Sequence, residues 1–120
     1  MSVECNRIRG FTYTMPYMRE KFEDALGDAY GDFYFSAYDS ETDKVYIVND
    51  GMGGEYTRIV YPEKIQGPDC YQDDDDPYLK ISDEECPDDI YKQINALYKT
   101  VFNEDLNKSK IEKAIWYYWS

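Results

Sequence analysis

Residues 33–61 read FYFSAYDSETDKVYIVNDGMGGEYTRIVY, and this stretch decides the fold class. Side chains alternate with the two-residue period of a β-strand in three runs: Phe33–Tyr38, Lys44–Val48 and Tyr56–Tyr61. The segments between these runs are rich in Asp, Asn and Gly, which favour tight turns. The stretch therefore predicts an antiparallel meander of three strands.

The sequence before this meander predicts one more strand and one helix. Residues 3–13 fit a first strand, in which Gly10 indicates a bulge or bend. Apolar residues then recur with helical spacing from about Pro16, a residue that the first turn of a helix tolerates well. We expect this helix to stop between Gly27 and Gly31.

The sequence after the meander predicts two helices. The second helix begins near Ser82 or Cys86 and runs to about Phe102, with apolar residues on its inner face. Asn107 is expected to cap a third helix. One side of that third helix would carry Ile111, Ala114, Ile115, Tyr118 and Trp119.

The resulting order β-α-β-β-β-α-α predicts an α+β fold. We expect a small antiparallel sheet of three to four strands with helices packed on one face. Residues 1–120 should form a single acidic domain, because composition does not change abruptly along the chain. Residues 62–87 contain four prolines and four consecutive aspartates, so they predict a long acidic loop.

Charge is the strongest functional signal in the sequence. The chain has 25 acidic and 13 basic residues, a formal net charge of −12. Residues 20–55 hold ten acids and two bases, and residues 69–89 hold ten acids and one base. Such charge repels nucleic acids and anionic membranes and attracts basic proteins. A basic protein is therefore the expected partner, with no direct binding to nucleic acid or membrane.

The residue types argue against an enzyme. The chain contains no histidine, which removes the commonest general base at neutral pH. Cys70 and Cys86 lie among acids, whose field favours the protonated thiol over the nucleophilic thiolate. Residues 50–55 are glycine-rich but lack the lysine of a phosphate-binding loop. We expect a non-catalytic protein without a cofactor.

Metal binding is the other chemistry that the acids suggest. Asp69 with Asp73–Asp76 offers the oxygen ligands that Ca²⁺ prefers, but consecutive aspartates rarely converge on one ion. Asp39, Glu41 and Asp43 have the spacing that opens an EF-hand loop, but Lys44 stands where that loop needs glycine. A solvated acidic surface without a metal site is the expectation.

Fourteen tyrosines interleave with the acids, a pattern typical of surfaces that bind lysine and arginine. The predicted principal contact surface consists of Tyr71, Asp73, Asp74, Asp75, Asp76, Tyr78, Glu84 and Glu85. A second predicted patch on the first helix consists of Glu23, Asp24 and Asp28. The alternative is that these acids only maintain solubility, while Trp116, Tyr117 and the C-terminal helix make the contacts.

These features predict an inhibitor that blocks the DNA or RNA site of a basic nucleic-acid-binding protein, such as a nuclease or a CRISPR or restriction effector, by imitating phosphate charge. In size and charge the chain resembles the small acidic anti-CRISPR and anti-restriction proteins of phages, although it shares no motif with them. Two alternatives stay open: an immunity or antitoxin-like protein that neutralises a basic nuclease toxin, and a small carboxylate- or metal-dependent enzyme. The oligomeric state is not predicted.

The sequence also predicts a cytoplasmic protein, which for a phage protein means the cytoplasm of the host. Residues 1–7 lack the apolar run of a signal peptide. The longest purely apolar run, Ala114–Trp119, is too short to span a bilayer.

Overall fold

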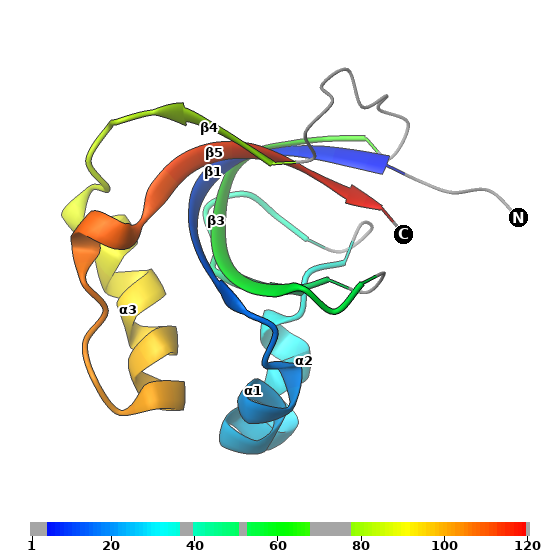
Figure 1. Cartoon of the computed structure of the whole chain (residues 1–120), viewed down its shortest axis with the longest axis vertical. Helices are drawn as coiled ribbons and strands as arrows, with labels where there is room; N and C mark the ends of the chain where they lie inside the picture. The colour runs from blue at the N-terminus through cyan, green and yellow to red at the C-terminus, as the bar shows by residue number, and fades with distance from the viewer. Residues whose placement is uncertain (1–4, 37–39, 51–52, 68–77, 120) are drawn as a thin grey trace, which may run out of the picture.

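A strongly bent antiparallel sheet with helices on its outer side forms the fold (Figure 1). The computed structural model describes residues 5–36, 40–50, 53–67 and 78–119. The five strands lie in the order β2-β3-β1-β5-β4. Their bounds are β1 Cys5–Pro16, β2 Tyr46–Asn49, β3 Tyr56–Gln66, β4 Tyr78–Ser82 and β5 Glu112–Trp119. The helices are α1 Arg19–Leu26, α2 Tyr30–Phe33 and α3 Asp88–Phe102, with 3₁₀ turns η1 at Gly27–Ala29 and η2 at Lys108–Lys110.

Strand β1 lies at the centre of the sheet and pairs with both β3 and β5. Its pairing with β3 shifts register between Arg9 and Gly10, which confirms the predicted bulge. A Cβ atom at Gly10 would lie 2.1 Å from the carbonyl oxygen of Tyr61. Only glycine lets the two backbones approach this closely at the bend.

Each face of the sheet covers its own apolar core. On the convex face, sheet residues such as Phe11 and Ile59 pack against Phe22 of α1 and against Ile90, Ile94 and Leu97 of α3. This spacing of four and three residues puts the apolar side of α3 against the sheet. On the concave face, inside the bend, the buried residues are Ile8, Phe35, Tyr46, Val48, Val60 and Trp116. No helix among the described residues is long and apolar enough to cross a membrane.

The α+β class, the bulged first strand and the second helix are confirmed, but the strand number and order are wrong. Phe33 ends α2, and Tyr34 forms only an isolated bridge to Ile47, so the strand expected at 33–38 is absent from the described part of that run. The expected third helix is strand β5, although Asn107 does accept a capping hydrogen bond from the Ser109 N–H at the start of η2.

The loop predicted at 62–87 is also partly wrong. Strand β3 continues to Gln66, and β4 occupies residues 78–82 as the partner of β5. Residues 68–77 lie outside the described residues.

Replacing Gly10 by alanine should destabilise the fold, because the new methyl group overlaps the backbone of β3. We expect a loss of at least about 1–3 kcal/mol in the free energy of unfolding, measured by urea denaturation. Gly31→Ala is the matched control, since a Cβ atom there meets nothing within 4 Å. Equal stability of the two variants would contradict the bulge.

Candidate functional site

The segment from Tyr17 to Tyr34 is an excursion on the outside of the sheet, held by hydrogen bonds at both ends. The Met18 N–H donates to Thr57 Oγ1 over 2.9 Å, and the Thr57 hydroxyl donates to Asn49 Oδ1 over 2.7 Å. Asn49 Nδ2 in turn donates to the Tyr30 hydroxyl over 2.8 Å. Strands β2 and β3 therefore position α1 and α2 through one chain of polar contacts.

This excursion carries exposed carboxylates that have no cationic partner within the described parts of the chain. They are spaced four residues apart, and we call them the α1–α2 acidic face: Glu20, Asp24, Asp28 and Asp32. The two bases of the excursion are engaged elsewhere. Arg19 pairs with Glu23, and the Lys21 ammonium lies 4.9 Å from the centre of the Phe102 ring.

Exposed tyrosines flank the α1–α2 acidic face. Tyr17, just before α1, is 41% exposed, and Tyr34, just after α2, is 40% exposed. With Leu79 they are the exposed large apolar residues of the described chain. Exposed aromatic rings beside carboxylates suit contact with lysine and arginine, because a cation can lie over the ring while it pairs with the acid.

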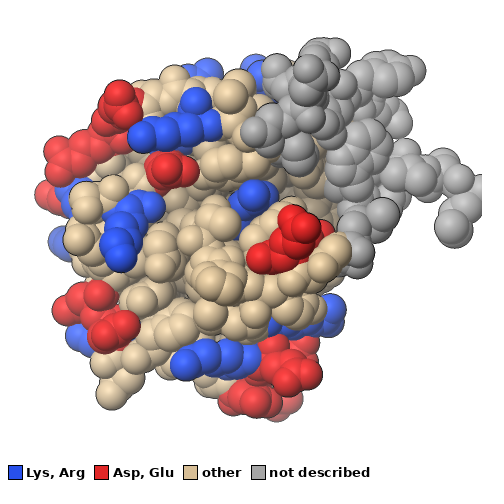
Figure 2. Space-filling view, viewed as in Figure 1, with Lys and Arg blue, Asp and Glu red and all other residues tan. Residues whose placement is uncertain are grey.

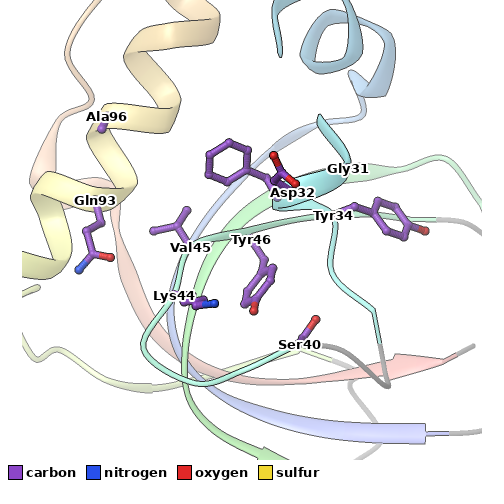
Figure 3. A pocket seen from close by; sticks show the side chains of 10 residues that line it. Gly31, Asp32, Tyr34, Ser40, Lys44, Val45, Tyr46, Gln93 and Ala96 are labelled. Atoms are coloured by element: carbon purple, nitrogen blue, oxygen red, sulfur yellow. The ribbon is translucent and has the colours of Figure 1, made fainter. Parts of the chain in front are cut away.

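A hollow adjoins each end of the excursion. The pocket at the α1 end, about 350 Å³, is lined by residues from Tyr17 to Glu23. The pocket at the α2 end, about 520 Å³, lies between α2, the segment leading into β2, and α3 (Figure 3). Its lining residues include Asp32, Tyr34, Tyr46, Lys44 and Gln93. The excursion thus combines exposed charges, aromatic rings and two adjoining pockets.

The acids of the predicted principal surface that are described are in ion pairs. Lys113 Nζ lies 2.7 Å from a Glu84 oxygen. Lys108 Nζ lies 3.5 Å from a Glu85 oxygen and 2.6 Å from Asp88 Oδ1, and this contact holds the pKa of the Asp88 carboxyl below its usual value. These lysines come from η2 and β5, so the local charge is largely balanced. Tyr71 and Asp73–Asp76 lie outside the described residues.

Tyr78 belongs to a different surface from Glu84 and Glu85. It lies half-buried on the concave face, where its hydroxyl donates to Glu112 Oε2 over 2.8 Å and contacts Thr12 Oγ1 at 2.7 Å. Burial is the main cause that raises the pKa of Tyr78, so its hydroxyl stays protonated at neutral pH. Among the described members of the predicted principal surface, Tyr78 therefore lies apart from Glu84 and Glu85.

Two of the three acids of the second predicted patch are exposed without a cationic partner among the described residues. Asp24 and Asp28 belong to the α1–α2 acidic face, whereas Glu23 is occupied by Arg19. The predicted patch left out Glu20 and Asp32. The four-residue spacing of Glu20 and Asp24 within α1 indicated the first, whereas α1 ends at Leu26, so helical spacing does not reach Asp32.

The alternative contact surface on a C-terminal helix is wrong. Trp116 and Tyr117 are buried residues of β5, with exposed fractions of 0% and 4%, so neither ring is available to a partner.

Acidic atoms also appear elsewhere on the surface. Figure 2 shows them dispersed around an uncharged middle and interleaved with basic atoms. One group of acidic atoms lies at the lower edge of this view, where Figure 1 places α1 and α2. Charge is therefore not concentrated on the viewed face as a whole, and local pairing decides which acids are available.

No family model, no curated protein and no solved structure matches the chain. Within the described ranges, no group of three or more acidic or cysteine side chains is arranged to hold a metal ion. The geometry of the α1–α2 excursion therefore carries the functional argument.

Thr57→Val should weaken the attachment of the excursion, because it leaves the Met18 N–H and Asn49 Oδ1 without their partner. We expect a loss of about 1–3 kcal/mol in stability and faster amide exchange at Met18. Thr42→Val, at an exposed position, is the control. Unchanged exchange at Met18 would show that Thr57 does not hold the excursion.

Cys86 should resist alkylation in the folded protein. Burial is the largest cause that raises the pKa of its thiol to about 11, ahead of the nearby acids that the sequence had suggested. At pH 8 roughly one thiol in a thousand is then ionised. Peptide mass spectrometry after iodoacetamide treatment should show modification of Cys86 mainly after denaturation. Rapid modification in the native state would contradict this burial.

Proposed function

We propose that the protein is a non-catalytic inhibitor that binds a basic nucleic-acid-binding protein and covers its DNA or RNA site. The observation that carries the proposal is the α1–α2 acidic face, a set of exposed carboxylates without cationic partners among the described residues, flanked by Tyr17 and Tyr34.

A nucleic-acid site presents lysine and arginine to a dense row of phosphates, with about one charge per 1.7 Å of duplex axis. Glu20 and Asp24 stand one helical turn apart on α1, which places their backbones about 6 Å apart along the helix axis. Asp28 and Asp32 extend the set through η1 and α2. Cations in the partner site can therefore exchange phosphates for carboxylates.

The positioning of the face also supports binding. Its excursion is tied to β2 and β3, so these acids need little ordering when a partner arrives. The exposed tyrosines add apolar contact area next to the charges, which favours a specific complex over purely electrostatic attraction.

The test compares two variants with the same change in net charge. In the first, Glu20, Asp24, Asp28 and Asp32 are replaced by their amides. In the second, Asp83, Glu84, Glu85 and Asp88 are replaced in the same way, which removes acids that are paired with lysines. Each variant is four charges less negative than the wild type, whose net charge is −12. Each immobilised protein is exposed to nuclease-treated lysate.

We expect the wild type and the second variant to retain a nucleic-acid-binding protein that duplex DNA or RNA displaces. The first variant should lose at least about tenfold of this binding, and all binding should weaken between about 50 and 200 mM salt. Equal loss in both variants would show that total charge decides binding. Capture that ignores salt and nucleic acid would overturn the proposal.

A further inference from the structure

Arg58 of β3 is a charged residue buried on the concave face of the sheet. Its side chain contacts two rings, with the guanidinium carbon 3.8 Å from the centre of the Tyr56 ring and 4.3 Å from that of Tyr78. Its Nε–H donates to Thr14 Oγ1 over 3.1 Å. Arg58 is only 7% exposed.

The described residues around Arg58 provide no direct counter-charge. Arg58 forms no ion pair with any acid of the described chain. Asp50 is close enough to favour the charged guanidinium, but its two carboxylate oxygens accept hydrogen bonds from the Gly53 and Glu55 amides. Glu112, another acid near this face, accepts from the Tyr78 hydroxyl. Burying a charge without a paired ion is costly, so the arrangement calls for an explanation.

The two tyrosines compensate only part of the cost of burying the Arg58 charge. Cation–π contact with both rings stabilises the guanidinium charge. Of the N–H groups of this arginine, Thr14 takes one and the Tyr56 hydroxyl offers a further contact. The remaining N–H groups keep the fork geometry that fits a carboxylate or phosphate.

A second buried donor lies in the same apolar cluster. Trp116 is fully buried, and its Nε1–H has no acceptor among the described residues. Tyr56 and Tyr78, which enclose Arg58, pack against the cluster that contains Trp116. A buried N–H without an acceptor is rare in proteins, because its desolvation is not compensated. Among the described residues, this face therefore holds a buried guanidinium without an ion pair and a buried indole N–H without an acceptor, and both favour a ligand that accepts hydrogen bonds.

We propose that the concave face binds a small organic anion, with a carboxylate or phosphate group on Arg58 and an uncharged body against the aromatic residues of this face. Phosphate and carboxylate share the acceptor geometry that the guanidinium recognises, and the experiment distinguishes them. This site lies on the opposite face of the sheet from α1 and α2, so it is independent of the proposed inhibitor function.

The experiment titrates the protein with sodium phosphate and, separately, with sodium acetate, at constant ionic strength maintained with chloride. The readouts are the midpoint of thermal unfolding and the ¹H–¹⁵N signals of the Arg58 Nε–H and the tryptophan indoles. Arg58→Met keeps an unbranched side chain at this position and removes its charge. Arg9→Met is the control, because it removes an exposed arginine from β1.

We expect one of the two anions to raise the midpoint in a saturable manner and to shift the Arg58 signal in the wild type and in Arg9→Met. Both effects should disappear in Arg58→Met. Saturation by phosphate would assign a phosphate ligand, and saturation by acetate a carboxylate ligand. If Arg58→Met does not fold, the Arg58 signal of the wild type decides. A signal that neither anion moves, or a midpoint that rises equally in Arg58→Met, would overturn the proposal.

Discussion

The fold depends on one constraint: β1 pairs with a neighbouring strand on each edge while both of its faces are buried. Successive side chains of a strand point to opposite faces, so Phe11 and Met15 meet the helices while Ile8 and Thr12 meet the concave side. A change in register would exchange the two cores at once. The bulge at Gly10 allows such a long strand to bend without losing either neighbour. The bend in turn creates an outer face for the helices and an enclosed inner face.

This two-sided burial explains which parts of the fold the sequence could predict. Helix α3 is buried on one side only, and the spacing of Ile90, Ile94 and Leu97 identifies it. Strand β5 is buried on both faces, so its apolar residues show no two-residue alternation, and the set from Ile111 to Tyr118 also satisfies a helical period. Its run of β-branched and aromatic residues favoured a strand and was the better signal. Strand β4 was hidden because it lies beside a stretch of prolines and aspartates that reads as a loop.

The candidate site shows a different limit of sequence reasoning. Composition correctly indicates an excess of acids, but availability depends on which lysines fold back onto them. Lys108 and Lys113 are more than twenty residues from Glu84 and Glu85 and become their partners only because η2 and β5 pack beside the start of α3. The acids of the α1–α2 acidic face have no such neighbours in the described chain. Pairing across the fold therefore decides which of the described acids are available to a partner, and no local pattern contains that information.

Exposed acids and buried Arg58 also respond differently to their surroundings, and this separates the two proposed sites. Charges on the α1–α2 acidic face act through water, where salt at physiological concentration screens them beyond about 8 Å. Arg58 lies in a region of lower dielectric, where an anion in contact is attracted more strongly and screened less. The net negative charge of the protein repels anions at long range, so only a ligand that reaches Arg58 and satisfies its donors gains enough to remain. The same excess of acids favours a basic partner at the α1–α2 acidic face and repels anions from the Arg58 site. An anion therefore binds Arg58 only if direct contact with the guanidinium outweighs this repulsion.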